Sequence, residues 1–194
     1  MLPPEIESRI FKDLRTCALN YRHGAEGNPT WTTRIAHDIC RHGEEAGYWA
    51  AALRFKPKYQ RMNSIRNEWL FDAVWLKYIG ENLVSIPLAM ECEWGTDSEI
   101  DDDFQKLIVS RASLRVMVFG DRNLKNDTTA ERLWLSAKLF EESAGDRYLL
   151  AGFENLEDGW TFYRFTVGEG LEKCDAFGHA TSEPAQFRWN TIKN

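Results

Sequence analysis

The sequence predicts a single-domain α/β protein in which helices flank a central mixed β-sheet. Three observations predict this class. The 194 residues are 43% hydrophobic and include eight tryptophans, enough to bury one substantial core without disulfides or metals. Segments with helical spacing of apolar residues alternate with short apolar runs typical of strands. No repeat, low-complexity tract or linker interrupts the chain, so residues 1–194 are expected to form one domain.

The N-terminal part is expected to form two helices. Two prolines near the start favour a helix start, and the turn-forming stretch HGAEGNP at 23–29 ends the first helix, whose expected range is about 4–21. A second helix is expected from near Thr30 to Gly47. Apolar residues recur at helical spacing in both: Ile6, Ile10, Leu14 and Ala18 in the first, and Trp31, Ile35, Ile39 and Cys40 in the second.

Three strands are expected to follow. The apolar run YWAAALRF at 48–55 is the first of them. The stretches 68–76 and 83–94 are the second and third, and they are joined through YIGEN, which carries the turn residues Gly80 and Asn82.

A helix over about 97–112 comes after the third strand. Thr96 and Glu99 match a capping box, and acidic residues crowd the first turn. The apolar residues of this segment form one helical stripe: Ile100, Phe104, Leu107 and Ile108.

Residues 127–167 are expected to complete the sheet after a short strand at 114–120. Thr128 and Glu131 match a second capping box before a helix, and the apolar runs RYLLAGF and WTFYRFTV are two further strands with a turn between them. The expected order is therefore two helices, three strands, a helix, a strand, a helix and two strands.

Three carboxylates stand inside or beside the most strand-like stretches of the chain. Alternation along a strand puts Glu91 and Glu93 on one face and leaves Cys92 on the other, while Asp72 lies in the preceding strand. Burying charge costs several kcal/mol unless something offsets it, so the arrangement predicts a bound cation. The alternative is that this face of the sheet is wet and water solvates the three acids.

This placement of acids resembles the core of the PD-(D/E)XK, or restriction-endonuclease-like, nuclease superfamily. The resemblance covers about residues 30–120, in which three strands are followed by a helix and a strand. It implies that Asp72 is the first acid of the motif and Glu91 the second. Glu93 stands where the family usually has lysine, and Phe71 replaces the proline of the motif.

The resemblance implies a Mg²⁺ ion, with Mn²⁺ as a substitute, held by Asp72 and Glu91. Such an ion can activate water, neutralise the phosphate and assist the leaving oxygen. Glu93 would be a general base or an additional ligand. Lys106, in the following helix, is the alternative donor for the missing lysine, although Asp102 and Asp103 could equally hold it in an ordinary helical ion pair.

Two further features belong to this hypothesis. The family often draws another acid from the helix before the first strand, which nominates Glu44 or Glu45. The segment 47–67 contains basic residues, interleaved aromatics and no acid between Gly47 and Asn67, so it is expected to contact nucleic acid unless it is only a solvated connection. Its basic residues are Arg54, Lys56, Lys58, Arg61 and Arg66.

Several other functional classes find no support in the sequence. The net charge of −6 argues against a protein that coats nucleic acid by bulk charge. The four scattered cysteines favour reduced structural thiols, and the histidines have neither metal-ligand spacing nor a neighbouring nucleophile. There is no Gly-rich nucleotide loop, no membrane-spanning run and no signal pattern, so we expect no nucleotide cofactor, no membrane partner and a cytoplasmic protein.

The functional hypothesis is a Mg²⁺-dependent endonuclease that cuts DNA, of the restriction or defence type. Symmetric cleavage would favour a two-fold homodimer, although no motif marks an interface. The rival hypothesis is a catalytically inactive scaffold that kept the fold and binds nucleic acid or a protein partner. The acidic balance and the missing motif lysine favour this rival.

Overall fold

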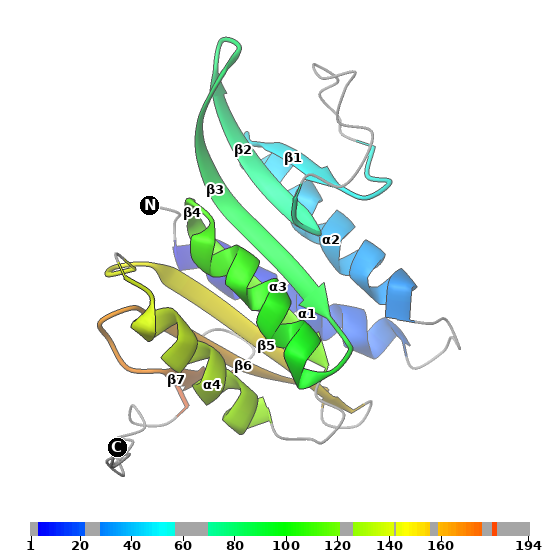
Figure 1. The fold of residues 1–194 in the computed structure, drawn as a ribbon. Helices are drawn as coiled ribbons and strands as arrows, with labels where there is room; N and C mark the ends of the chain where they lie inside the picture. Colours follow the sequence, from blue (N-terminus) through cyan, green and yellow to red (C-terminus); the bar gives the residue numbers. More distant parts are fainter. Residues whose placement is uncertain are drawn as a thin grey trace.

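The computed structural model describes residues 4–21, 28–56, 70–120, 126–141, 143–155, 159–175 and 180–181. These residues confirm the α/β class, with one mixed sheet flanked by helices in a single domain (Figure 1). The described helices are α1 (Pro4–Tyr21), α2 (Asn28–Glu45), α3 (Asp97–Val109) and α4 (Asn126–Leu139). The described strands are β1 (Trp49–Ala52), β2 (Ala73–Ile79), β3 (Asn82–Glu93), β4 (Ala112–Gly120), β5 (Arg147–Asn155), β6 (Gly159–Thr166) and β7 (Glu172–Cys174).

The strands lie in the sheet in the order in which they occur along the chain, from β1 to β7. The central strands β3, β4 and β5 are parallel, and every other neighbouring pair is antiparallel. Helix α3 connects β3 to β4, and α4 connects β4 to β5, as parallel neighbours require. The expected order of elements is confirmed, with β7 as an unpredicted addition.

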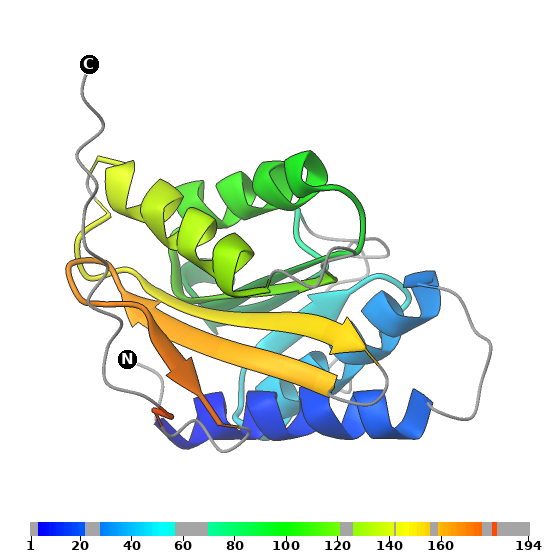
Figure 2. The same ribbon diagram turned by 90° about the horizontal axis from the view of Figure 1, so that it is seen from below.

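Helices cover both faces of the sheet. Helices α1 and α2 lie on one face and α3 and α4 on the other (Figure 2). Alternation along β3 divides its side chains between two cores: Met90 and Cys92 pack toward α1 and α2, whereas Ala89 packs toward α3 and α4. Glu91 follows the alternation of Ala89 and therefore belongs to the face that α3 covers.

The contact between α2 and β2 is especially close. The indole of Trp75 is fully buried, and its Nε1 donates to the carbonyl oxygen of Ile39 at 2.9 Å. A Cβ atom at Gly43 would lie only 2.6 Å from this indole, so the helix reaches the strand only because residue 43 has no side chain. This packing holds α2 against β2 close to the start of that strand.

Several expected boundaries shift. The first strand ends at Ala52 because Leu53 and Arg54 form a turn, with Arg54 at φ 58°. Helix α3 ends at Val109, and Ser110 adopts an extended backbone as its cap. The second capping box was wrong: α4 already begins at Asn126, so Thr128 lies inside the first turn and cannot be the N-cap.

The described cysteines agree with the expectation of structural thiols. Cys40, Cys92 and Cys174 are buried and form no disulfide, and burial raises the pKa of the Cys174 thiol to about 11. None of the described helices combines the length and the apolar character that crossing a bilayer demands.

Candidate functional site

Asp72 and Glu91 lie side by side where β2 begins. The register pairs Ala73 with Met90, so the next position along the ladder sets Asp72 opposite Glu91. The backbone N–H of Asp72 donates to Glu91 Oε2 at 3.4 Å, and the N–H of Cys92 donates to Asp72 Oδ2 at 2.8 Å. The two carboxylates are therefore held together by the backbone of adjacent strands, as the sequence predicts for a shared site.

Glu91 is a buried acid with incomplete compensation. It is 3% exposed, and burial, followed by the nearby charge of Asp72, raises the pKa of its carboxyl group to about 8. Its Oε1 atom accepts no hydrogen bond from the part of the chain that the structure describes. A cation that reaches Oε1 would therefore compensate for the burial of this carboxylate.

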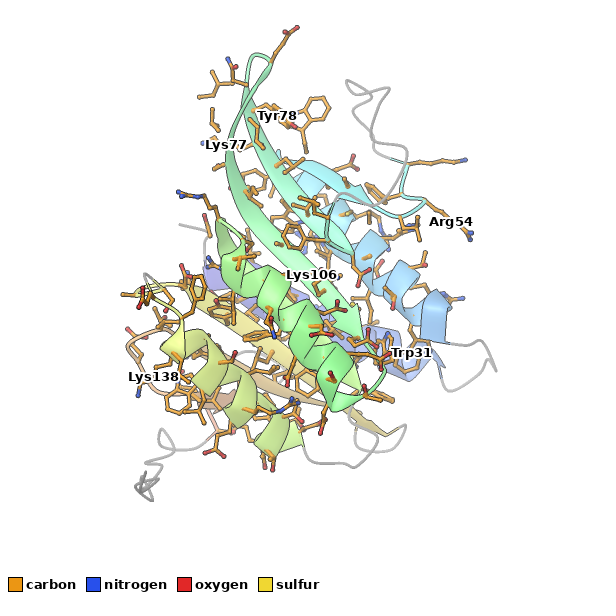
Figure 3. The ribbon with its side chains drawn as sticks, in the orientation of Figure 1. Trp31, Arg54, Lys77, Tyr78, Lys106 and Lys138 are labelled. Atoms are coloured by element: carbon orange, nitrogen blue, oxygen red, sulfur yellow. The ribbon has the colours of Figure 1, made fainter. Side chains whose placement is uncertain are left out.

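Helix α3 supplies the nearest cation. Lys106 Nζ lies 3.5 Å from Glu91 Oε1 and 2.6 Å from Asp103 Oδ1, one helical turn earlier. The hydrogen bond to Asp103 is the main cause of the raised pKa of Lys106. Lys106 thus makes the helical ion pair with Asp103 and also lies beside the strand acid Glu91. Figure 3 labels Lys106 on α3, which lies in front of the sheet in this view.

The first turn of α3 sets the position of Lys106 relative to Glu91. Thr96 Oγ1 accepts from the N–H of Glu99, and Glu99 Oε2 accepts from the N–H of Thr96 at 2.7 Å. This is the capping box that the sequence predicts. The capping box therefore fixes the residue at which α3 begins. From this start, Lys106 lies at a position from which its ammonium reaches Glu91 on the sheet.

A buried arginine fixes the other end of α3. Arg115, on β4, is 4% exposed, and its Nε donates to the carbonyl oxygen of Leu107 at 2.9 Å. Its Nη2 donates to the carbonyl oxygen of Ser110 at 2.6 Å and lies 2.9 Å from Asp146 Oδ2. Sequence reasoning overlooked Arg115, although a single charge within the apolar run LRVMVFG was a signal for it.

Glu93 is not brought together with Asp72 and Glu91. Its Oε1 accepts from the N–H groups of Trp94 at 2.7 Å and Gly95 at 2.6 Å, so the carboxylate turns back onto the backbone that follows β3. Among the described residues, no group of three or more Asp, Glu, His or Cys side chains is arranged to hold a metal. The expected three-carboxylate centre is thus reduced to a pair.

Glu44 and Glu45 also lie elsewhere. Both belong to α2, which covers the face of the sheet opposite α3. Glu45 is exposed and pairs with Arg9 and His42, and the hydrogen bond from Arg9 lowers the pKa of its carboxyl group. The structure therefore does not bring this pair of acids to the candidate site.

The basic segment is described only in part. Arg54 and Lys56 are exposed just after β1, and Figure 3 shows Arg54 pointing away from the body of the protein. Lys58, Arg61 and Arg66 lie outside the described residues. The two described cations are thus available to a ligand approaching the β1 edge of the sheet.

The Asp72 and Glu91 pair fits a divalent cation in its chemistry. Carboxylate oxygens are the ligands that Mg²⁺ prefers, and Mg²⁺ in proteins is commonly held by one or two carboxylates, with water and phosphate completing its shell. Glu91 Oε1 has no hydrogen bond to lose among the described residues. A bound cation would offset both the burial and the repulsion from Asp72 that now raise the pKa of Glu91.

Comparison of the chain with protein-family models, with curated proteins and with solved structures gave no match.

Proposed function

We propose that the protein is a Mg²⁺-dependent nuclease that hydrolyses phosphodiester bonds of DNA, of the restriction or defence type. One observation carries the proposal: the buried Glu91 lies beside Asp72 and 3.5 Å from the ammonium of Lys106. Two acids from adjacent strands with a lysine beside them are the groups that this hydrolysis needs. They are also the groups of the PD-(D/E)XK motif, with the lysine supplied from the helix.

Each residue then has a defined role. Asp72 and Glu91 would hold the ion, which when bound supplies an activated water and charge compensation at the phosphate. Lys106 steadies the attacking water and the charge that develops on the phosphate oxygens. Asp103, 2.6 Å from Lys106 Nζ, orients this ammonium. Glu93 has a structural role in this scheme, because both of its known partners are backbone N–H groups.

A second candidate function is supported by a different observation. Asp72 Oδ2 and Glu91 Oε2 each accept a backbone N–H from the neighbouring strand, which is also how acids clamp two strands in a protein without catalytic activity. In that case the chain would be a scaffold that binds nucleic acid or a protein partner, and the acids would contribute only to the fold.

Calorimetric titration with Mn²⁺ separates the two candidates. We expect the wild type to bind Mn²⁺ and to cut plasmid DNA with Mg²⁺, and we expect Asp72→Asn to lose both properties because one of the two carboxylates loses its charge. Asp102→Asn, the same change at an exposed acid of α3, is the matched control and should behave as wild type.

The scaffold candidate predicts the opposite pattern. A wild-type protein that neither binds Mn²⁺ nor cuts nucleic acid would refute the nuclease. Unfolding of Asp72→Asn, under conditions in which the metal-free wild type is stable, would assign this acid to the fold instead.

The basic segment is proposed to contact the DNA backbone. We expect the double variant Arg54→Ala and Lys56→Ala to weaken DNA binding and to flatten its salt dependence, because each lost phosphate contact lowers the slope of log affinity against log salt by roughly 0.9. Binding is measured without Mg²⁺ at several salt concentrations. Lys138→Ala, at an exposed lysine of α4, is the control, and an unchanged slope in the double variant would place the DNA elsewhere.

A further inference from the structure

Leu70 combines two unfavourable features immediately before the acid pair. It is 75% exposed, and its backbone has a φ of 60°, in the left-handed region. This conformation is unfavourable for any residue with a Cβ atom and rare for a bulky one. Among the described residues other than glycine, only Arg54 shares a positive φ. Leu70 is therefore the one exposed apolar residue of the described chain that also has a strained backbone.

The fold does little to offset these two costs at Leu70. A glycine would adopt the left-handed backbone without strain, and asparagine tolerates it better than leucine does. Because most of the leucine is exposed, contacts within the chain remove little of its apolar surface from water. Strained backbone conformations cluster at active sites and at ligand-binding residues, so this outlier points to a role in binding.

The backbone on the C-terminal side of Leu70 is fixed. Phe71 is buried in the core that the sheet forms with α3 and α4. Asp72 is hydrogen bonded to β3 in both directions, since its N–H donates to Glu91 Oε2 and its Oδ2 accepts from the N–H of Cys92. The exposed leucine is thus attached to a part of the chain that is held beside the acid pair. An apolar side chain on a fixed backbone loses little freedom when it binds a partner.

DNA bound at the acid pair would bring a base within reach of Leu70. Two residues of chain span at most about 7 Å, which limits the distance between the backbones of Leu70 and Asp72. Successive nucleotides of one strand advance by only about 3.4 Å along the helix axis, so the bases next to a bound phosphate fall in the same range. The faces of the bases are the apolar surface of DNA, and leucine is among the side chains that proteins insert between base steps.

We propose that Leu70 is an apolar wedge that packs against a base of the DNA beside the phosphate bound at Asp72 and Glu91. This inference rests on the proposed nuclease function and adds a substrate contact to it. The wedge touches a base, whereas the basic segment touches phosphates, so the two contacts respond differently to salt.

Cleavage of plasmid DNA by the full-length protein, with Mg²⁺ and at several salt concentrations, tests the wedge. Leu70→Asn and Leu70→Gly should each lower kcat/KM about tenfold through the lost apolar contact. The slope of log kcat/KM against log salt should stay that of the wild type, because leucine displaces no counterion from a phosphate. Leu70→Met, which keeps a long apolar side chain, should cleave as wild type.

Two further measurements separate the wedge from a role in folding. The melting temperature of Leu70→Asn should be unchanged or raised, since asparagine tolerates the left-handed backbone better, and its affinity for Mn²⁺ should equal that of the wild type. Leu139→Asn, at an 82% exposed leucine of α4, is the matched control and should cleave as wild type.

The outcomes that overturn the wedge differ from those that overturn the nuclease. Wild-type cleavage by Leu70→Asn and Leu70→Gly, a flattened salt slope, or a lowered melting temperature of Leu70→Asn would refute the wedge and leave the nuclease standing. A wild-type protein that neither binds Mn²⁺ nor cuts DNA would refute the nuclease and the wedge with it.

Discussion

The substitution Glu91→Gln is expected to abolish Mg²⁺-dependent cleavage while making the metal-free protein more stable. Loss of one of two carboxylate ligands removes most of the affinity for the ion, and we expect at least roughly a 100-fold loss of activity. The stability should rise because glutamine keeps an acceptor for the N–H of Asp72 but carries no buried charge beside Asp72.

The pH dependence of stability gives this prediction a second measurement. The pKa of Glu91 rises from an ordinary value of 4.5 to about 8 in the folded protein, so between these values the folded state holds a proton that the unfolded state has lost. The contribution of this proton to the free energy of unfolding is fully present below pH 4.5 and is lost as the pH rises through 8. Each pKa unit corresponds to about 1.4 kcal/mol, and relaxation of the protein around Glu91 reduces this effect. The free energy of unfolding of the wild type should therefore fall by about 2–4 kcal/mol over this range.

Chemical denaturation at about pH 5, 6.5 and 8 without metal measures this loss. Glu91→Gln should lack it, and the control Glu131→Gln on α4 should retain it. If Glu91→Gln were less stable than wild type at the highest of these pH values, Glu91 would be a structural acid that the fold needs in its charged form, and the metal assignment would fail.

The second large effect is expected at Lys106. Lys106→Ala should reduce turnover about 100-fold, in the range of a lost proton-transfer or charge-stabilising group. Its affinity for Mn²⁺ should barely change, because an ammonium is not a metal ligand. Glu93→Ala should have only a mild effect on turnover, since the Glu93 carboxylate is engaged with the N–H groups of Trp94 and Gly95.

Single-turnover cleavage and Mn²⁺ titration of both variants decide between the two residues, with Lys138→Ala as the control for removal of a lysine. A large loss in Glu93→Ala, with Lys106→Ala close to wild type, would assign the base or an additional ligand to Glu93, and Glu93→Lys could then retain some activity. Wild-type cleavage by both alanine variants would refute the mechanism even if the fold is right.

The fold was largely predictable because each element carries a local signal. The spacing of apolar residues marked α1 and α2, and the capping box of Thr96 and Glu99 marked the start of α3. The predictions failed where the signal was too short or ambiguous. Strand β7 has only three residues, and the Thr128 pattern matched a cap although the backbone was already helical from Asn126.

The candidate site was predictable only in part. Strand alternation placed Glu91 on a face with Asp72 nearby, and the position of Lys106 in α3 brought its ammonium within reach. Alternation also placed Glu93 on that face, but it cannot describe a side chain that bends back onto free N–H groups where a strand ends. Arg115 was missed because it acts on the carbonyl groups of another element, which only the tertiary structure brings close.

Arg115 and the capping box together have a consequence for motion. The ends of a helix normally unfold first. In α3, however, Arg115 of the central strand β4 binds carbonyl groups at the C-terminal end, and the capping box of Thr96 and Glu99 closes the first turn. The backbone at Lys106 can therefore loosen only together with the sheet. Only the side-chain torsions of Lys106 then remain free to change. Its ammonium can leave Glu91 and return within nanoseconds while the backbone stays in place.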